Sequence, residues 1–192
     1  MLVKYFIVLI VSLVQFKAFA FGTSQKEEPL SANVCGLAVL FTTPYKESRS
    51  QYSLSNEVNL SIFQFLSTRV VSGATIATNI TCQSIEGMDY SGSEEEWKTF
   101  FNNSINTLSK KGVKNLKMTI VGTDRQVYKG NLPFREYKFF GTFNEGDQMI
   151  YNLTILNKAS NTLYTVSVSG HSMIEKQVIN EFKQVTNAIN FE

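Results

Sequence analysis

Three consecutive runs in the C-terminal half of the chain constrain its fold more than any other feature. They are Arg135–Phe143, Asp147–Leu156 and Thr162–Ser169, and short polar turns separate them. The second run has apolar residues at alternate positions: Met149, Tyr151, Leu153 and Ile155. A period of two is typical of a strand that buries one of its faces. The sequence therefore predicts an antiparallel meander of three strands.

Two helices are predicted around this meander. Met173–Ile189 has apolar residues at three- and four-residue spacing, which places them in one stripe along a helix. Ser93–Lys111 opens with a capping box, in which Ser93 and Glu96 bond to free N–H groups of the first turn. Helices and a meander bury their apolar faces by packing on one another. The predicted fold class is therefore α+β, an antiparallel β-sheet flanked by helices.

The N-terminal part of the chain has weaker patterns. Residues 21–33 are polar and predict a flexible N-terminal arm, which leaves residues 34–192 as a single α+β domain. Val34–Thr42 is a brief apolar run that predicts a buried strand, whereas Thr43–Asn56 has no periodicity and predicts a surface loop. Two further runs alternate clearly enough to predict strands: Arg69–Gln83 and Lys114–Val121.

Residues 1–20 have the three parts of a secretory signal peptide. Lys4 gives a short positive region, Tyr5–Val14 is almost wholly apolar, and Ala18-Phe19-Ala20 is a small-x-small cleavage site. An uncleaved membrane anchor is the alternative, although the apolar core is shorter than the ~20 residues that a membrane span needs. We expect an exported protein, periplasmic or secreted, with no stable membrane anchor after cleavage. We favour a bacterial source over a eukaryotic one.

The charge balance of the mature chain argues against nucleic acid as a partner. Lys4 and Lys17 leave with the signal peptide, which brings the 18 basic residues down to the number of acidic ones, 16. The longest basic cluster that remains is Lys110-Lys111. An electrostatic footprint for nucleic acid or for an anionic lipid surface is therefore missing.

Two cysteines, Cys35 and Cys82, are a candidate disulfide. An even number of cysteines in an exported protein favours such a bond. Both lie in apolar runs, so the alternative is a pair of buried thiols that behave as small apolar side chains.

The sequence contains no recognisable catalytic motif, no cofactor-binding motif and no metal-ligand spacing. The single histidine, His171, stands at the start of the last predicted helix, beside Ser172. It could act as a base for that hydroxyl, but adjacency in sequence does not create the hydrogen-bond geometry that a nucleophile needs. We expect His171 to be a surface residue.

The predicted meander is rich in aromatic residues, and these form the candidate binding surface. The residues are Tyr137, Phe139, Phe140 and Tyr151. Phe139 and Phe140 are consecutive, so their side chains point to opposite faces of a strand. If both faces are covered, all four residues belong to the core. If one face is open, the aromatic residues on it form a surface for a ligand or a partner.

Two short patterns carry a resemblance to a known family. One is a Tyr-x-Gly step, Tyr128 and Gly130, before the meander, and the other is a Tyr-x-Leu-Thr strand at Tyr151–Thr154. With the order of the predicted elements, the chain resembles the Mog1/PsbP-like α/β/α sandwich, which includes bacterial exported proteins related to the DcrB group. The resemblance covers about residues 70–191. It implies an accessory or interaction protein and gives no catalytic residues to carry over.

These observations predict an exported, non-enzymatic accessory or binding protein whose partner is a protein or a small ligand. Two alternatives stay open. An immunity or inhibitor protein would use a surface loop such as Thr43–Asn56 to hold its target. A small secreted hydrolase or effector enzyme would bring Ser, His or carboxylate groups together in one pocket.

Overall fold

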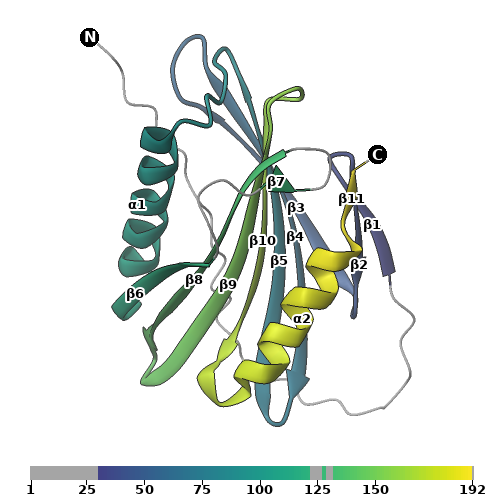
Figure 1. Ribbon diagram of the computed structural model, residues 1–192, viewed down its shortest axis with the longest axis vertical. Helices are drawn as coiled ribbons and strands as arrows, with labels where there is room; N and C mark the ends of the chain where they lie inside the picture. The colour runs from purple at the N-terminus through teal and green to yellow at the C-terminus, as the bar shows by residue number, and fades with distance from the viewer. Residues whose placement is uncertain (1–29, 122–126, 129–131, 192) are drawn as a thin grey trace.

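The computed structural model describes residues 30–121, 127–128 and 132–191. Within these ranges the chain forms eleven β-strands, two α-helices and one short 3-10 helix (Figure 1). In chain order they are β1 (Leu30–Val34), β2 (Leu37–Phe41), β3 (Tyr45–Ser53), β4 (Asn59–Val71), β5 (Ala74–Glu86), α1 (Glu94–Lys110), β6 (Lys114–Val121), β7 (Val127–Tyr128), β8 (Leu132–Phe143), β9 (Gly146–Asn157), β10 (Thr162–His171), η1 (Ser172–Ile174), α2 (Glu175–Ala188) and β11 (Asn190–Phe191).

The main sheet has eight strands, and all its pairings are antiparallel. Its order is β3-β4-β5-β10-β9-β8-β6, and β7 pairs with β8 beside this path. The predicted meander is confirmed as β8, β9 and β10, which follow one another in the sheet. The meander joins the N-terminal hairpins through β10, because β10 also pairs with β5. The sheet edges are therefore β3 and β6.

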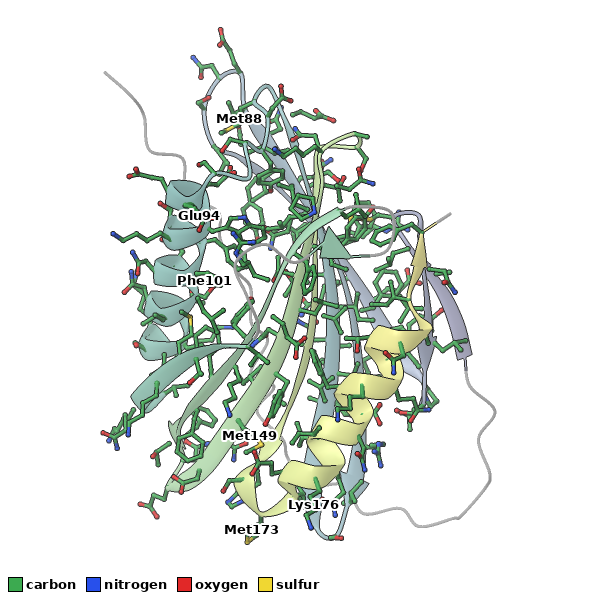
Figure 2. The ribbon with its side chains drawn as sticks, viewed as in Figure 1. Met88, Glu94, Phe101, Met149, Met173 and Lys176 are labelled. Carbon is green, nitrogen blue, oxygen red and sulfur yellow. A yellow bond between two sulfur atoms is a disulfide. The ribbon has the colours of Figure 1, made fainter. Side chains whose placement is uncertain are left out.

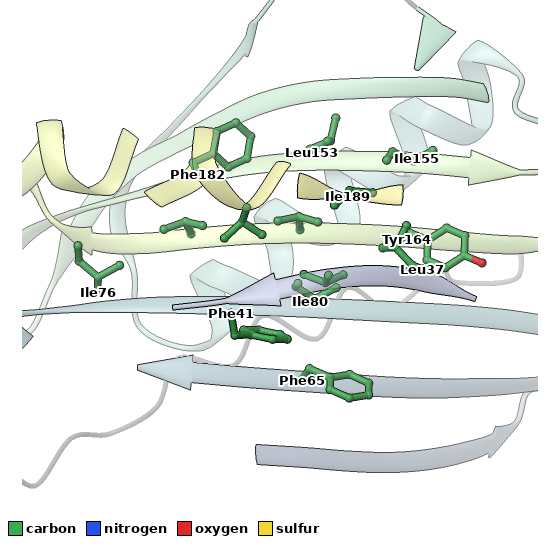
Figure 3. Packing of buried hydrophobic residues seen from close by; sticks show 14 of the residues in the cluster. Leu37, Phe41, Phe65, Ile76, Ile80, Leu153, Ile155, Tyr164, Phe182 and Ile189 are labelled. Carbon is green, nitrogen blue, oxygen red and sulfur yellow. The ribbon is translucent and has the colours of Figure 1, made fainter. Parts of the chain in front are cut away.

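One face of the main sheet is covered by α2 and by a small second sheet. The small sheet has the order β1-β2-β11, so the last strand of the chain pairs with one of the first. The apolar stripe of α2 and β2 enclose a hydrophobic core with β5, β9 and β10 (Figure 3). The core includes the fully buried residues Leu37, Ile80, Ile155, Val166, Val178 and Ile189.

The other face carries α1, which lies over the β6 end of the sheet (Figure 1). The predicted N-terminal cap is confirmed, because Glu96 N donates to Ser93 Oγ over 3.2 Å, and Glu96 Oε2 accepts from Gly92 N over 2.6 Å. The last turn ends at Lys110, and Gly112 has a φ of 92°, a conformation that glycine adopts without strain. The apolar side of α1 forms a second core with β8, β9 and β10.

The predicted fold class was wrong. The chain is mainly antiparallel β-structure with only two α-helices, and it is not a sheet sandwiched between helical layers. The error comes from the N-terminal part, where Leu30–Glu86 supplies five strands in succession. A three-stranded sheet therefore covers part of the face for which the predicted fold has only helices.

Two N-terminal predictions need correction for the same reason. Leu30–Asn33, which fell in the predicted flexible arm, belongs to β1, and the predicted single strand Val34–Thr42 contains a turn at Cys35-Gly36. The predicted loop Thr43–Asn56 is mostly the edge strand β3, paired with β4 over its whole length. Eight of its nine residues are exposed, so both faces are polar and no alternation could reveal it. The predicted signal peptide, residues 1–20, lies outside the described residues.

A disulfide joins Cys35 to Cys82, with the two Cα atoms 6.4 Å apart. Cys82 lies on β5 and is fully buried, while Cys35 lies in the turn between β1 and β2. The bond therefore ties the small sheet to the main sheet. A disulfide of this kind fits an exported protein, because it persists in an oxidising compartment.

A buried ion pair makes a second connection across the same core. Glu181 of α2 is 3% exposed, and its Oε2 accepts from Arg69 Nε at 3.1 Å and from Arg69 Nη2 at 2.9 Å. Its other oxygen, Oε1, accepts from Thr42 Oγ1 at 2.7 Å and from Thr78 Oγ1 at 3.4 Å. Both carboxylate oxygens are thus satisfied, as a buried charge requires.

The α1-facing side of the central strands carries a band of buried polar side chains. We call this the polar band; its members are Asn79, Thr81, Gln83, Asn152, Thr154, Thr165 and Ser167. Neighbouring members bond across strands: Ser167 Oγ donates to Asn152 Oδ1 over 2.7 Å, and the hydroxyls of Thr154 and Thr165 lie 3.1 Å apart. Gln83 differs, because neither its Oε1 nor its Nε2 has a hydrogen-bond partner among the described residues.

Candidate binding cleft

An open cleft of about 280 Å³ lies between α1 and β6. Figure 2 labels two of its residues on α1, Glu94 near the N-terminal end and Phe101 further along the helix. The complete lining is Glu94, Trp97, Lys98, Phe101, Asn102, Ile105, Met118, Ile120 and Arg135. The floor is apolar and aromatic, and charged groups stand at its rim.

Helical and strand periodicity together place these side chains. Trp97, Phe101 and Ile105 recur every four residues, so they form a row along one face of α1. Met118 and Ile120 are two residues apart on β6, so they point to the same face of the strand. Trp97 and Phe101 are buried, but Ile120 is 41% exposed. The cleft is therefore apolar throughout its floor and still open to solvent.

Arg135 forms the charged end of the cleft. The residue is only 7% exposed, although arginine is rarely buried without a partner. Its Nη2 donates to Glu94 Oε1, its Nη1 donates to the backbone oxygen of Phe134 over 3.0 Å, and its guanidinium carbon lies 5.0 Å from the centre of the Trp97 ring. The ion pair and the cation–π contact compensate the buried charge. They also hold α1 against β8.

Packed aromatic rings support the cleft from below. The ring centre of Tyr137 on β8 lies 5.0 Å from that of Phe101 and 6.2 Å from that of Phe100, both in edge-on geometry. The Tyr137 hydroxyl lies 3.1 Å from Thr154 Oγ1, a member of the polar band. Burial raises the pKa of Tyr137, with the bond to Thr154 acting in the opposite direction, so the phenol is neutral at physiological pH. The rings beneath the floor are thus closely packed and uncharged.

The structure does not bring the four predicted binding residues together. Tyr137 and Phe139 are buried beneath α1, whereas Phe140 and Tyr151 lie on the opposite face of the sheet. Phe140 is 39% exposed. The Tyr151 hydroxyl donates to Glu175 Oε1 over 3.0 Å, and burial, this bond and the Glu175 charge together raise the pKa of Tyr151 to about 12.

His171 ends β10 and caps the short helix that follows. Its Nδ1 accepts a hydrogen bond from the backbone N–H of Met173 over 3.1 Å, and no side chain of the described residues bonds to its ring. The described residues contain no group of three or more His, Cys, Asp or Glu side chains placed to hold a metal ion. No helix in the described part of the chain is long and apolar enough to cross a membrane.

Sequence reasoning missed most of the cleft. The sequence predicts a helix at Ser93–Lys111 and a strand at Lys114–Val121, and the apolar residues of the cleft belong to these two elements. Both elements are present as α1 and β6, but the cleft depends on how they lie against one another. No signal in the sequence marks Lys114–Val121 as an edge strand, and only that position leaves its apolar side chains with one neighbour missing.

Comparisons with known proteins show limited similarity. No family model matches the sequence, so the resemblance to the Mog1/PsbP-like family stays a prediction, and no curated protein matches it. Among solved structures, the chain is similar to a protein of unknown function from Pseudomonas aeruginosa, PA94, described as a putative regulator. That match has a TM-score of 0.44 and 9% identity over 82% of this chain and 93% of the other.

A second similar structure is LpqN of Mycobacterium tuberculosis, which is described as involved in cell envelope biogenesis. The match has a TM-score of 0.39 and 8% identity, and it covers 85% of this chain and 90% of that one. Similarity at this level identifies no function for the chain.

Proposed function

We propose that the protein is an exported, non-enzymatic accessory protein that binds its partner through the cleft between α1 and β6. The observation that carries this proposal is the open apolar floor of the cleft, where Ile120 is 41% exposed beside the buried rings of Trp97 and Phe101. Exposed apolar surface next to aromatic side chains is typical of an interaction site. The cleft is smaller than the ~300–1,000 Å³ of most small-molecule pockets, so it suits a side chain or a group of similar size.

Two further features support export and binding. The Cys35–Cys82 disulfide fits the periplasm or the extracellular space, and the pattern of residues 1–20 is that of a secretory signal peptide. The Nδ1 of His171 caps a helix, and among the described residues no hydroxyl or carboxylate bonds to the His171 ring, as it would to a general base in a hydrolase.

The chain offers a direct reporter for this proposal, since Trp97 is its single tryptophan and lines the cleft. The probe is N-acetylphenylalaninamide, which presents one apolar side chain and a peptide backbone. We expect a saturable change in Trp97 fluorescence on titration. The apparent affinity from this titration should fall at least fivefold in Ile120→Gln, which makes the floor polar. It should stay unchanged in the control Val121→Gln.

Val121 is a matched control because it is 37% exposed on the same strand but points to the other face of the sheet. A fluorescence response that is absent, or that Ile120→Gln leaves unchanged, would reject the cleft as the binding site.

A further inference from the structure

The strand next to the cleft is an open edge of the main sheet. Within the described sheet, β6 pairs only with β8, so its other side faces no strand (Figure 1). In an antiparallel strand, alternate residues direct their N–H and C=O groups to one neighbour and the remaining residues direct theirs to the other. Half of the backbone groups of β6 therefore point away from β8, and such an edge is a template for a further strand.

The two halves of β6 differ in how well this edge is protected. The first half carries an exposed lysine, Lys114, and a bulge between Lys114 and Lys117, in which Asn115 has a φ of 52°. Charges and bulges are the devices by which proteins block pairing at an edge. The second half, Lys117–Val121, pairs with β8 in continuous register and has no such device apart from Lys117 itself.

Apolar exposure concentrates on the unprotected half. Seven large hydrophobic residues are exposed among the described residues: two of them, Ile120 at 41% and Val121 at 37%, lie on this half of β6, and a third, Phe140 at 39%, lies on the neighbouring β8. Phe140 is the direct partner of Lys117 on β8. An exposed apolar edge strand is an aggregation hazard unless a partner covers it.

The cleft lies where the side chains of an added strand would point. Neighbouring strands lie ≈ 4.8 Å apart, and residues opposite one another place their side chains on the same face. A segment paired with Lys117–Val121 would therefore carry alternate side chains above Met118 and Ile120, which line the cleft. The volume of about 280 Å³ accommodates a large apolar side chain from such a segment.

Charge indicates the composition of the segment. Lys98 on the cleft rim and Lys114 and Lys117 on β6 are exposed cations. The acidic group on the rim, Glu94, is engaged in the ion pair with Arg135. Opposite charges across an interface favour association and set its register.

We propose that Lys117–Val121 is a docking edge for an extended peptide segment of a partner protein. The segment adds to the sheet as a strand beside β6, places a central apolar side chain in the cleft and presents flanking acidic residues to the lysines. The backbone bonds supply affinity and the cleft supplies selectivity, as in other cases of strand addition. This inference rests on the proposed function and names the kind of partner.

The test uses the purified protein and a display library of random seven-residue segments. We expect enrichment of segments that alternate, with a large apolar residue near the centre and Asp or Glu at the ends. Their affinity should fall at least tenfold for Ile120→Gln and change less than twofold for Val70→Gln, which replaces a 72% exposed apolar residue on β4, far from this edge in the sheet. Enrichment of basic or non-alternating segments, or equal binding to both variants, would overturn the proposal.

Backbone pairing is tested with two methylated versions of the best segment. One has N-methyl groups on its odd amides and the other on its even amides, so the side chains are the same in both. Because strand addition uses only alternate amides, one version should lose binding and the other should retain it. Equal loss or equal retention would show that the segment does not bind as a strand.

Two other outcomes separate this inference from the proposed function. If N-acetylphenylalaninamide binds the cleft but the library yields no segment, the cleft is a binding site and strand addition is wrong. If neither binds, both proposals fail. Sedimentation that finds a dimer, with the amides of Lys117–Val121 protected from hydrogen exchange, would assign the edge to a second copy of this chain and also overturn the proposal.

Discussion

Replacing the two partners of the buried ion pair should have unequal effects on stability, because they are unequally exposed. The Glu181 side chain is 3% exposed and the Arg69 side chain is 32% exposed. Arg69→Met leaves the carboxylate buried with only the two threonine hydroxyls as partners. Breaking a buried pair in this way costs about 3–5 kcal/mol. In Glu181→Gln the guanidinium that remains is partly in water, so the penalty for leaving it without a counter-charge is smaller.

The size of the Glu181→Gln effect follows from its hydrogen bonds. Arg69 donates twice to Oε2, at 3.1 and 2.9 Å, and a glutamine oxygen in the same place keeps both bonds but loses the negative charge. Bonds to charged groups contribute about 1.5–3 kcal/mol and neutral ones about 0.5–1.5 kcal/mol. The hydroxyls of Thr42 and Thr78 can rotate to accept from the new amide. We therefore expect a loss of about 1–2 kcal/mol, which is smaller than the Arg69→Met effect.

Urea unfolding at pH 7 measures both variants, with Asn180→Gln as the control on the same helix. Asn180 is exposed, so its replacement should change the free energy of unfolding by no more than about 0.5 kcal/mol. Should Glu181→Gln prove as destabilising as Arg69→Met, the reasoning from unequal exposure would be refuted.

Three further outcomes follow from single sites. Cys82→Ser should lower the unfolding free energy by about 4 kcal/mol, as estimated for closing a loop of 47 residues, and thiol titration should find no free thiol in the unfolded, unreduced wild type. Gln83→Met should raise it by about 1–3 kcal/mol, because the fully buried amide has no partner in the described structure; a loss in urea unfolding would contradict this. Burial raises the pKa of Glu136 above its unfolded value of about 4.3, against the effect of Lys183. Between the unfolded and the folded pKa of Glu136, the folded state binds more protons than the unfolded state. The free energy of unfolding therefore falls as pH rises through this range. The stability of Glu136→Gln relative to wild type should consequently increase from pH 4 to pH 7. A difference in unfolding free energy that is the same at both pH values would argue against this reasoning.

Local patterns in the sequence predicted the individual C-terminal elements but not the architecture. The alternation in Asp147–Leu156 and the capping box at Ser93 correspond to β9 and α1, because each depends on residues close in the chain. The pairing of β11 with β2 depends on contacts between residues more than 140 positions apart, and no local pattern reports them. The strand β3 was missed because both of its faces are exposed.

The candidate cleft was missed for a different reason. Alternation identified one apolar face in each meander strand and left open whether the other face is covered; the polar residues Asn152, Thr154 and Thr165 of that face are buried by the elements packed around them. Conversely, Ile120 has an apolar side chain and remains exposed, since its strand is at an edge. Hydrophobicity of a residue does not reveal its position within a sheet, and the cleft exists because of that position.

The polar band has a consequence for the fidelity of folding. A shift of one residue between neighbouring strands turns every side chain to the opposite face. Such a slip in β9 would move Asn152 and Thr154 into the core occupied by Leu153 and Ile155, away from Ser167 and Thr165. Each buried polar group left without a partner costs about 1–3 kcal/mol. The band thus penalises misregistered sheets at several strands at once, and this discrimination comes from side chains that contribute little apolar burial.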